Sequence, residues 1–214
     1  MRHHGTMKVK QPAEINKLIK NMKRISAIIA NGHLGGAYDK VLKYFEQEEE
    51  LIKLFQGDIP KEIKNLHILW LWFRADIYAY KGNLTLSFKD AKELLTVAQL
   101  YDHKRGISNG RYVLGRYYWL SGDLDKALVH IDNAIRLSEE NLNDLMDFLM
   151  LADQLDLATR VSIDKEDIKR AKKYFRRLEE IRELKHGEFA INDIYRYVKA
   201  LLLKNLKSFI DLFH

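Results

Sequence analysis

Residues 111–137 read RYVLGRYYWLSGDLDKALVHIDNAIRL, and this stretch predicts two helices joined by a turn at Gly122. After the turn, apolar residues recur at the spacing i, i+3, i+4 and i+7, which places them on one face of a helix. Asp123 belongs to the residue types that cap helix N-termini by accepting backbone N–H groups. The apolar face consists of Leu124, Ala127, Leu128, Ile131, Ala134 and Ile135.

Small residues stand where the two predicted helices would approach each other. Gly115 lies inside the first helix, where glycine costs about 1 kcal/mol relative to alanine, so its presence indicates a packing requirement. Ala127 and Ala134 supply the small residues of the second helix. A helix pair of this kind leaves an apolar face open, and it therefore predicts stacking on similar units.

Similar turn-plus-helix segments recur along the chain. They begin at Gly36, Gly82, Gly122 and Glu166, at spacings of 46, 40 and 44 residues. The chain has only two prolines, and its glycines stand mostly between periodic segments, a distribution that favours long helices. We predict an all-α solenoid with helices at about 12–31, 37–55, 60–81, 84–101, 107–120, 124–138, 141–161, 165–184 and 188–204.

The repeats predict one continuous domain over residues 12–204, a right-handed solenoid of about four and a half repeats. Residues 1–11 are expected to be a flexible or tag-derived N-terminus. Residues 205–214 are apolar, so they either cap the last repeat or mark a chain that natively continues. An apolar solenoid end can also pair with its copy, which would give a homodimer.

Composition narrows the class of protein. The 214 residues carry a net charge of +6 from 36 basic and 30 acidic side chains, and the two signs are interspersed. This charge allows a nucleic-acid partner without requiring one. Cysteine is absent, which excludes disulfides and thiol nucleophiles. Because no apolar run reaches the length of a membrane span and residues 1–10 are polar and basic, we expect a cytoplasmic protein without a membrane partner.

The motifs of common catalytic and metal sites are missing from the sequence. Eight histidines occur, none at a metal-ligand spacing, and neither a phosphate-binding loop nor a nucleophile elbow is present. The carboxylate runs at 46–50 and 139–140 are expected on solvated faces, whereas acid–base catalysis needs a shielded pocket. We therefore predict a protein that is not an enzyme and uses no cofactor or metal.

The third repeat carries a family resemblance. Its residues resemble the tetratricopeptide repeat family in register, and the likeness extends more loosely over residues 12–204, with Arg111 standing where the family prefers tryptophan. The spacing of roughly 40 residues is similar to the longer repeats of bacterial regulators and archaeal repeat proteins. The matching residues are Leu114, Gly115, Tyr118, Gly122, Ala127, Ile131 and Ala134.

This resemblance implies a concave groove that binds a peptide. In the family the first helix of each pair lines the groove, through residues that point away from the packing face. Aromatic residues and arginine are also favoured at binding hot spots, although Trp72 and Trp119 could instead pack against neighbouring helices. The implied groove residues are Trp72, Asp76, Tyr80, Tyr112, Arg116, Trp119, Asp153, Asp156 and Arg160. The leading prediction is a non-enzymatic adaptor or scaffold for a protein segment.

Two alternatives remain open. The basic run at 169–177 places its cations largely on one side of a helix, which would suit nucleic-acid phosphates. The simpler interpretation of the run is a solvated outer face, balanced by Glu179, Glu180 and Glu183 just beyond it. The second alternative is a regulatory or sensor portion of a larger polypeptide, motivated by the apolar C-terminal end.

Overall fold

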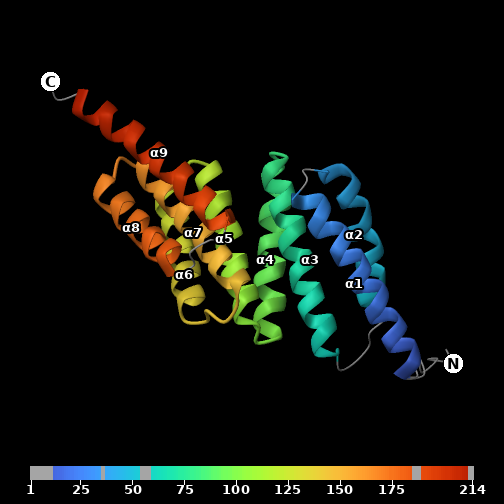
Figure 1. Cartoon of the computed structure of the whole chain (residues 1–214). Coiled ribbons are helices and arrows are strands. Elements are labelled where there is room, and N and C mark those ends of the chain that lie inside the picture. The colour runs from blue at the N-terminus through green and yellow to red at the C-terminus, as the bar shows by residue number, and fades with distance from the viewer. Residues whose placement is uncertain (1–11, 35–36, 54–58, 185–188, 212–214) are drawn as a thin grey trace. The chain divides into compact units, whose positions relative to one another are not determined.

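The computed structural model describes residues 12–34, 37–53, 59–184 and 189–211, and every element in these ranges is an α-helix (Figure 1). The all-α fold class is thereby confirmed, while the handedness of the predicted superhelix stays a prediction. The helices are α1 (Pro12–Leu34), α2 (Tyr38–Lys53), α3 (Lys61–Tyr80), α4 (Leu84–Leu100), α5 (Lys104–Leu120), α6 (Leu124–Glu139), α7 (Leu145–Asp164), α8 (Ile168–Leu184) and α9 (Phe189–Asp211).

The chain forms two compact units, residues 1–74 and 75–214. In the first unit α1 packs on α2, and buried Met22, Ile29 and Val41 belong to its core. The Trp70 indole of α3 donates a hydrogen bond to the Ser26 hydroxyl of α1. The expectation of one continuous domain over residues 12–204 stays a prediction. The predicted segments 1–11 and 212–214 lie outside the described residues.

One type of turn makes four connections of the second unit. In each, a residue with positive φ is followed by a residue that caps the next helix, and the N–H of the capping residue donates to a carbonyl five residues back at 2.8–2.9 Å. The capping side chain accepts from the backbone N–H three residues on. The four pairs are Gly82–Asn83, Asp102–His103, Gly122–Asp123 and Glu166–Asp167.

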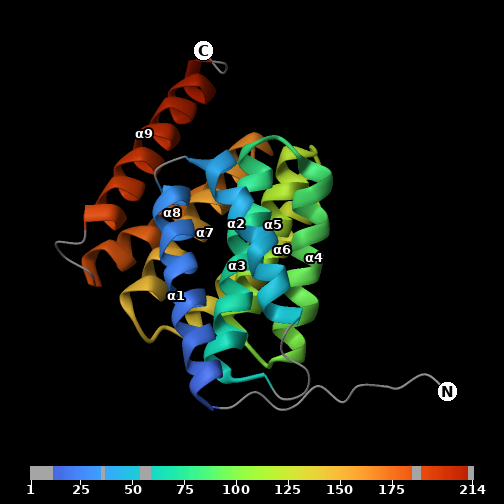
Figure 2. The same cartoon turned by 90° about the vertical axis from the view of Figure 1, so that its right-hand side faces the viewer.

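These caps explain where the predicted helix limits were wrong. α5 begins at Lys104 instead of 107, because the His103 ring accepts from the Gly106 N–H at 2.9 Å. α7 begins at Leu145 instead of 141, because Asp144 and Asp147 form a reciprocal capping box. α8 begins at Ile168, after the Asp167 cap, and α9 continues to Asp211 instead of stopping at 204. Figures 1 and 2 both show the C-terminal part of α9 projecting past α7 and α8.

The predicted apolar face of α6 forms the core between α5 and α6. Ala127, Leu128, Ile131 and Ala134 are all buried, and Val129, which lies off the predicted face, is exposed. Gly115 permits the close approach, since a Cβ there would lie 2.5 Å from Ile131 Cγ1. The packing role predicted for this glycine is therefore confirmed.

Polar contacts join the helices of the second unit in two sets. In the first set, Asp76 at the end of α3 forms an ion pair with Arg116 of α5. Trp119 of α5 donates a hydrogen bond to Asp164 of α7, and Arg160 of α7 lies over the ring of Tyr197 on α9. In the other set, α6 contacts α8 through Asp132–Arg170 and Glu139–Arg177. A buried Ser108 hydroxyl holds the sets together: it donates to the Ala134 carbonyl of α6 at 2.9 Å and accepts from Gln154 of α7 at 3.0 Å.

Glu166 occupies a backbone conformation that suits glycine. Its φ is 62°, close to the 74° and 82° of Gly82 and Gly122 at the equivalent positions. We expect Glu166→Gly to raise the free energy of unfolding by about 1 kcal/mol, because left-handed backbone costs a side-chain-bearing residue roughly 1–2 kcal/mol and glycine returns part of this as unfolded-chain entropy. Urea unfolding measures the change. The matched variant Gly122→Ala should show the opposite sign, and a gain in both variants would contradict the argument.

Gly115→Ala should destabilise the second unit. The added methyl would also lie 3.3 Å from the Ala127 carbonyl oxygen, so α5 and α6 must separate. Overpacking of this kind costs about 1–3 kcal/mol, more than alanine's better helix propensity returns. Thermal unfolding followed by circular dichroism should show a lower midpoint. An unchanged midpoint would mean that the two helices do not meet at Gly115.

Candidate partner-binding face

Eight of the nine predicted groove residues lie in the second unit, and contacts link them from helix to helix. They come from the end of α3, from α5 and from α7, each at spacings of three or four residues, which keeps each group on one side of its helix. Trp72 belongs to the first unit, where it stacks on Phe73 with ring centroids 4.8 Å apart. Its place in the groove stays a prediction. The eight residues are Asp76, Tyr80, Tyr112, Arg116, Trp119, Asp153, Asp156 and Arg160.

Arg116 is the centre of the face. Its guanidinium forms an ion pair with Asp76 and donates to the Tyr112 hydroxyl. It also lies 4.8 Å from the ring centroids of both Tyr80 and Tyr112, within the range of cation–π attraction. Burial is the largest single effect and opposes the positive charge, but Asp76, Tyr112, Tyr80 and Asp153 together outweigh it and raise the pKa of Arg116. Arg116 is thus a fixed cation whose planar group holds two tyrosines in place.

A second arginine repeats this arrangement at the other end of the face. Arg160 donates from Nε to Asp156 Oδ1 at 2.8 Å and makes a further bond to the second carboxylate oxygen. Its guanidinium lies 4.6 Å from the ring centroid of Tyr197 on α9. Tyr80 and Tyr197 are 56% and 51% exposed, so each arginine supports an aromatic ring that remains open to solvent.

Tyr197 was missed by the sequence analysis. Its neighbour Tyr195 is buried, while Tyr197, two residues on, is exposed. The local sequence does not show which of the two tyrosines is buried and which is exposed, because the contact of Tyr197 depends on how α9 packs against α7. Trp119 gives a clearer outcome: its indole N–H donates to Asp164 at 2.6 Å, so this tryptophan bridges α5 and α7 and is half-buried.

Asp153 differs from the other carboxylates of the face. Asp76 and Asp156 are held by the two arginines, whereas within the described part of the chain no hydrogen bond reaches Asp153. Burial raises the pKa of Asp153 to about 7, with Asp156 and Asp76 adding to the rise and Arg116 and Arg160 opposing it. The face therefore carries three carboxylates and two guanidinium groups, with one carboxylate half-protonated near neutrality.

The described residues also bear on other kinds of site. No group of three His, Cys, Asp or Glu side chains in the described ranges is placed to hold a metal ion. In the same ranges, no helix is both long and apolar enough to span a bilayer. The carboxylates at 139–140 are each engaged by an arginine, Glu139 by Arg177 and Glu140 by Arg136. The side chains of the run at 46–50 lie outside the described residues.

The fold is similar to one known from crystallography. The crystal structure of BtubC (BKLC) from P. vanneervenii superimposes with a TM-score of 0.61, covering 94% of this chain and 90% of that chain at 10% sequence identity. At this identity the likeness shows the fold alone. No family model matches the chain, and no curated protein matches its sequence. Membership of the tetratricopeptide repeat family stays a prediction.

Asp153 makes stability depend on pH. Between pH 4 and 7 the folded protein keeps a proton that the unfolded chain, with a pKa near 3.8, has released, so stability falls as pH rises through this window. Asp153→Asn cannot ionise. We expect the free energy of unfolding of the variant, relative to that of the native protein, to increase from pH 5 to pH 8 by at most about 3 kcal/mol. Urea unfolding at both pH values tests this, and a difference that does not change with pH would contradict it.

Proposed function

We propose that this protein is a non-enzymatic interaction module that binds a protein segment on the face formed by the end of α3, α5, α7 and Tyr197 of α9. The observation that carries the proposal is the pair of exposed tyrosines, Tyr80 and Tyr197, each supported by a guanidinium group at 4.8 and 4.6 Å. Tyrosine and arginine are among the residues on which binding energy concentrates.

The order of this face before binding supports the proposal. An exposed aromatic ring that is already stacked loses little conformational entropy when a partner covers it, and the smaller entropy loss raises the affinity. Arg116 and Arg160 are held by Asp76 and Asp156, so the supports themselves are fixed. The partner is expected to bring apolar groups to the two rings and a basic side chain to the excess carboxylate, Asp153.

Two of the earlier expectations rest on chain segments without described side chains. A homodimer through the apolar end and a regulatory portion of a larger polypeptide were both inferred from residues 205–214, and side chains beyond 205 lie outside the description. Nothing in the described residues favours either over the interaction module. The nucleic-acid alternative has support of its own in the exposed cations of α8.

The binding face is tested with peptides selected for affinity. A peptide chosen from a random displayed library against the full chain is titrated by calorimetry into the native protein, Tyr80→Ala and Tyr197→Ala. Each variant is expected to bind about 5–30-fold more weakly, the effect of removing one hot-spot residue. Both side chains are more than half exposed, so truncation leaves the core unchanged.

The matched controls are Leu100→Ala and Val129→Ala. These residues are also exposed and apolar, but they lie on α4 and α6, away from the two tyrosines. Their affinities should equal that of the native protein. If the tyrosine variants bind as well as the controls, the proposed face is wrong.

A further inference from the structure

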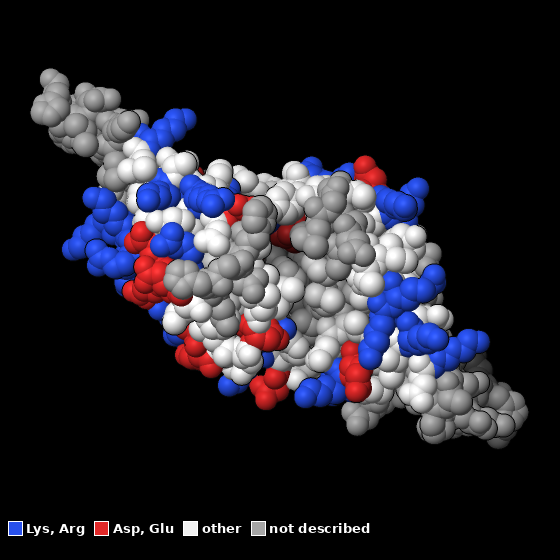
Figure 3. All heavy atoms as spheres, viewed as in Figure 1, with Lys and Arg blue, Asp and Glu red and all other residues white. Residues whose placement is uncertain are grey.

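A row of four cations runs along α8. Lys169, Lys172, Lys173 and Arg176 are all exposed and follow one another at i, i+3, i+4 and i+7, so they share one side of the helix over two turns. The residues that anchor α8, among them Ala171 and Leu178, are buried on the other side. We call the four cations the α8 stripe. Figure 3 shows blue spheres gathering at the left of the molecule, where α8 lies in Figure 1.

The neighbouring acidic residues do not neutralise this stripe. Glu180 forms an ion pair with Arg177 at 2.5 Å, Glu179 accepts a hydrogen bond from the Tyr195 hydroxyl, and Glu183 lies 4.0 Å from Arg182. Glu180 thus pairs with Arg177 of the basic run itself, while Glu179 and Glu183 contact residues outside the run. The solvated-face interpretation stays open, since the four cations are exposed. In the described part of the chain, no ion pair involves any of the four stripe cations.

Two further arginines of α8 fix the helix in place. Arg170 forms an ion pair with Asp132 on α6, and the Tyr174 hydroxyl donates to the same carboxylate. Arg177 forms an ion pair with Glu139 on α6 at 2.7 Å. The acidic groups of α6 that face α8 are thus occupied, and the stripe is held on a rigid element.

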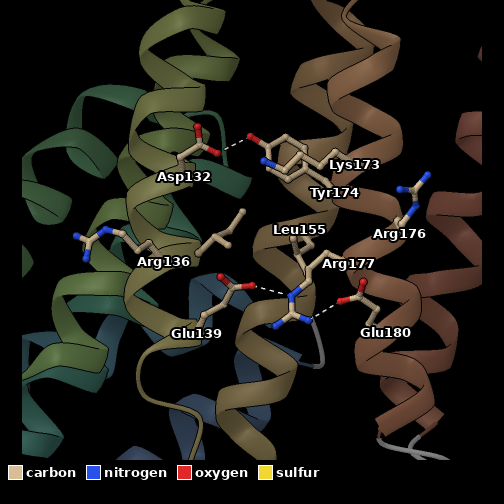
Figure 4. Close-up of a pocket in the computed structure, with 10 residues that line it drawn as sticks. Asp132, Arg136, Glu139, Leu155, Lys173, Tyr174, Arg176, Arg177 and Glu180 are labelled. Carbon is tan, nitrogen blue, oxygen red and sulfur yellow. Dashed lines mark hydrogen bonds and ion pairs between the residues drawn. The ribbon is translucent and has the colours of Figure 1, made fainter.

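A cavity of about 330 Å³ lies beside the stripe, between α6 and α8 (Figure 4). In Figure 4 Lys173 extends from α8 toward α6 and Arg177 lies between Glu139 and Glu180, while Arg176 points away from the cavity. The carboxylates of the lining already have partners, whereas in the described part of the chain the lining cations Lys173 and Arg176 have no ion pair, and of these two Lys173 extends toward the cavity. The lining residues are Asp132, Ile135, Arg136, Glu139, Leu155, Lys173, Tyr174, Arg176, Arg177 and Glu180.

We propose that the α8 stripe, together with the cavity beside it, binds the phosphate backbone of a nucleic acid without reading its sequence. A protein partner would be expected to need an apolar or aromatic anchor among the cations. Between Lys169 and Arg176 no large apolar side chain is exposed, and the nearest exposed one on α8 is Leu184 at the last residue of the helix, about two turns beyond Arg176. Positive charge without such an anchor is the pattern of backbone binding, in which the release of counterions supplies the affinity.

The test is the salt dependence of binding. Fluorescence anisotropy with a labelled 20-nucleotide RNA of mixed sequence is measured on the full chain from 50 to 200 mM KCl. Four phosphate contacts predict a slope of log K against log salt of about −3. Lys172→Ala/Lys173→Ala should reduce the slope to about half and weaken binding by roughly tenfold at 50 mM salt. The side chains are exposed, so circular dichroism should show unchanged folding.

Matched controls separate a local site from general positive charge. Lys89→Ala/Lys104→Ala removes two exposed lysines of α4 and α5 and leaves the stripe intact, so it should bind RNA like the native protein. Equal loss in the two double variants would overturn the proposal. So would an absence of binding at 50 mM salt, or polyglutamate competing as well as unlabelled RNA, which would assign the stripe to an acidic protein.

Discussion

The three-residue turn between helices is the constraint on which the second unit depends. Its middle residue has the left-handed conformation and its third residue caps the following helix, so the chain reverses within three residues. Glycine serves at two of these positions, and Asp102 and Glu166 accept the same conformation at the others. The backbone groups at each reversal are satisfied by the turn itself, which allows four connections to share one geometry although their sequences differ.

Because each turn reverses the chain, alternate helices come next to each other and give the unit two different polar faces. The end of α3, α5, α7 and α9 share a network in which arginines and aspartates pair closely and support tyrosine rings. α6 and α8 share ion pairs that occupy Asp132 and Glu139, and four cations of α8 have no ion pair in the described part of the chain. Preorganised aromatic rings suit a protein segment, whereas free cations without an apolar anchor suit a polyanion.

The first of these faces carries a cost in stability. Asp153 lies among Asp76, Asp156 and two arginines, and burial raises its pKa to about 7, so its ionisation near neutral pH opposes folding. The attraction of Asp153 to Arg116 and Arg160 does not offset the burial of its charge. A raised pKa of this kind is expected where a site receives a charged group of a partner.

The sequence by itself determined the helices and their core. The apolar spacing of 124–135, Gly115 and the turn at Gly122 all have local or periodic causes, and the structure confirms them. The candidate residues on α5 and α7 were named from the family resemblance, and helical periodicity puts each group on one side of its helix. Helix limits were wrong where capping by His103 and Asp144 decides the first turn, because these interactions depend on side-chain geometry.

Only the tertiary structure decided which charges remain free and which aromatic rings remain exposed. The sequence could not show that Glu179 accepts from Tyr195 or that Arg177 pairs with Glu139, since these contacts depend on the packing of α8 against α9 and α6. Nor could it show that Tyr197 meets Arg160, because α7 and α9 are distant along the chain and side chains at such separations meet only when the helices pack.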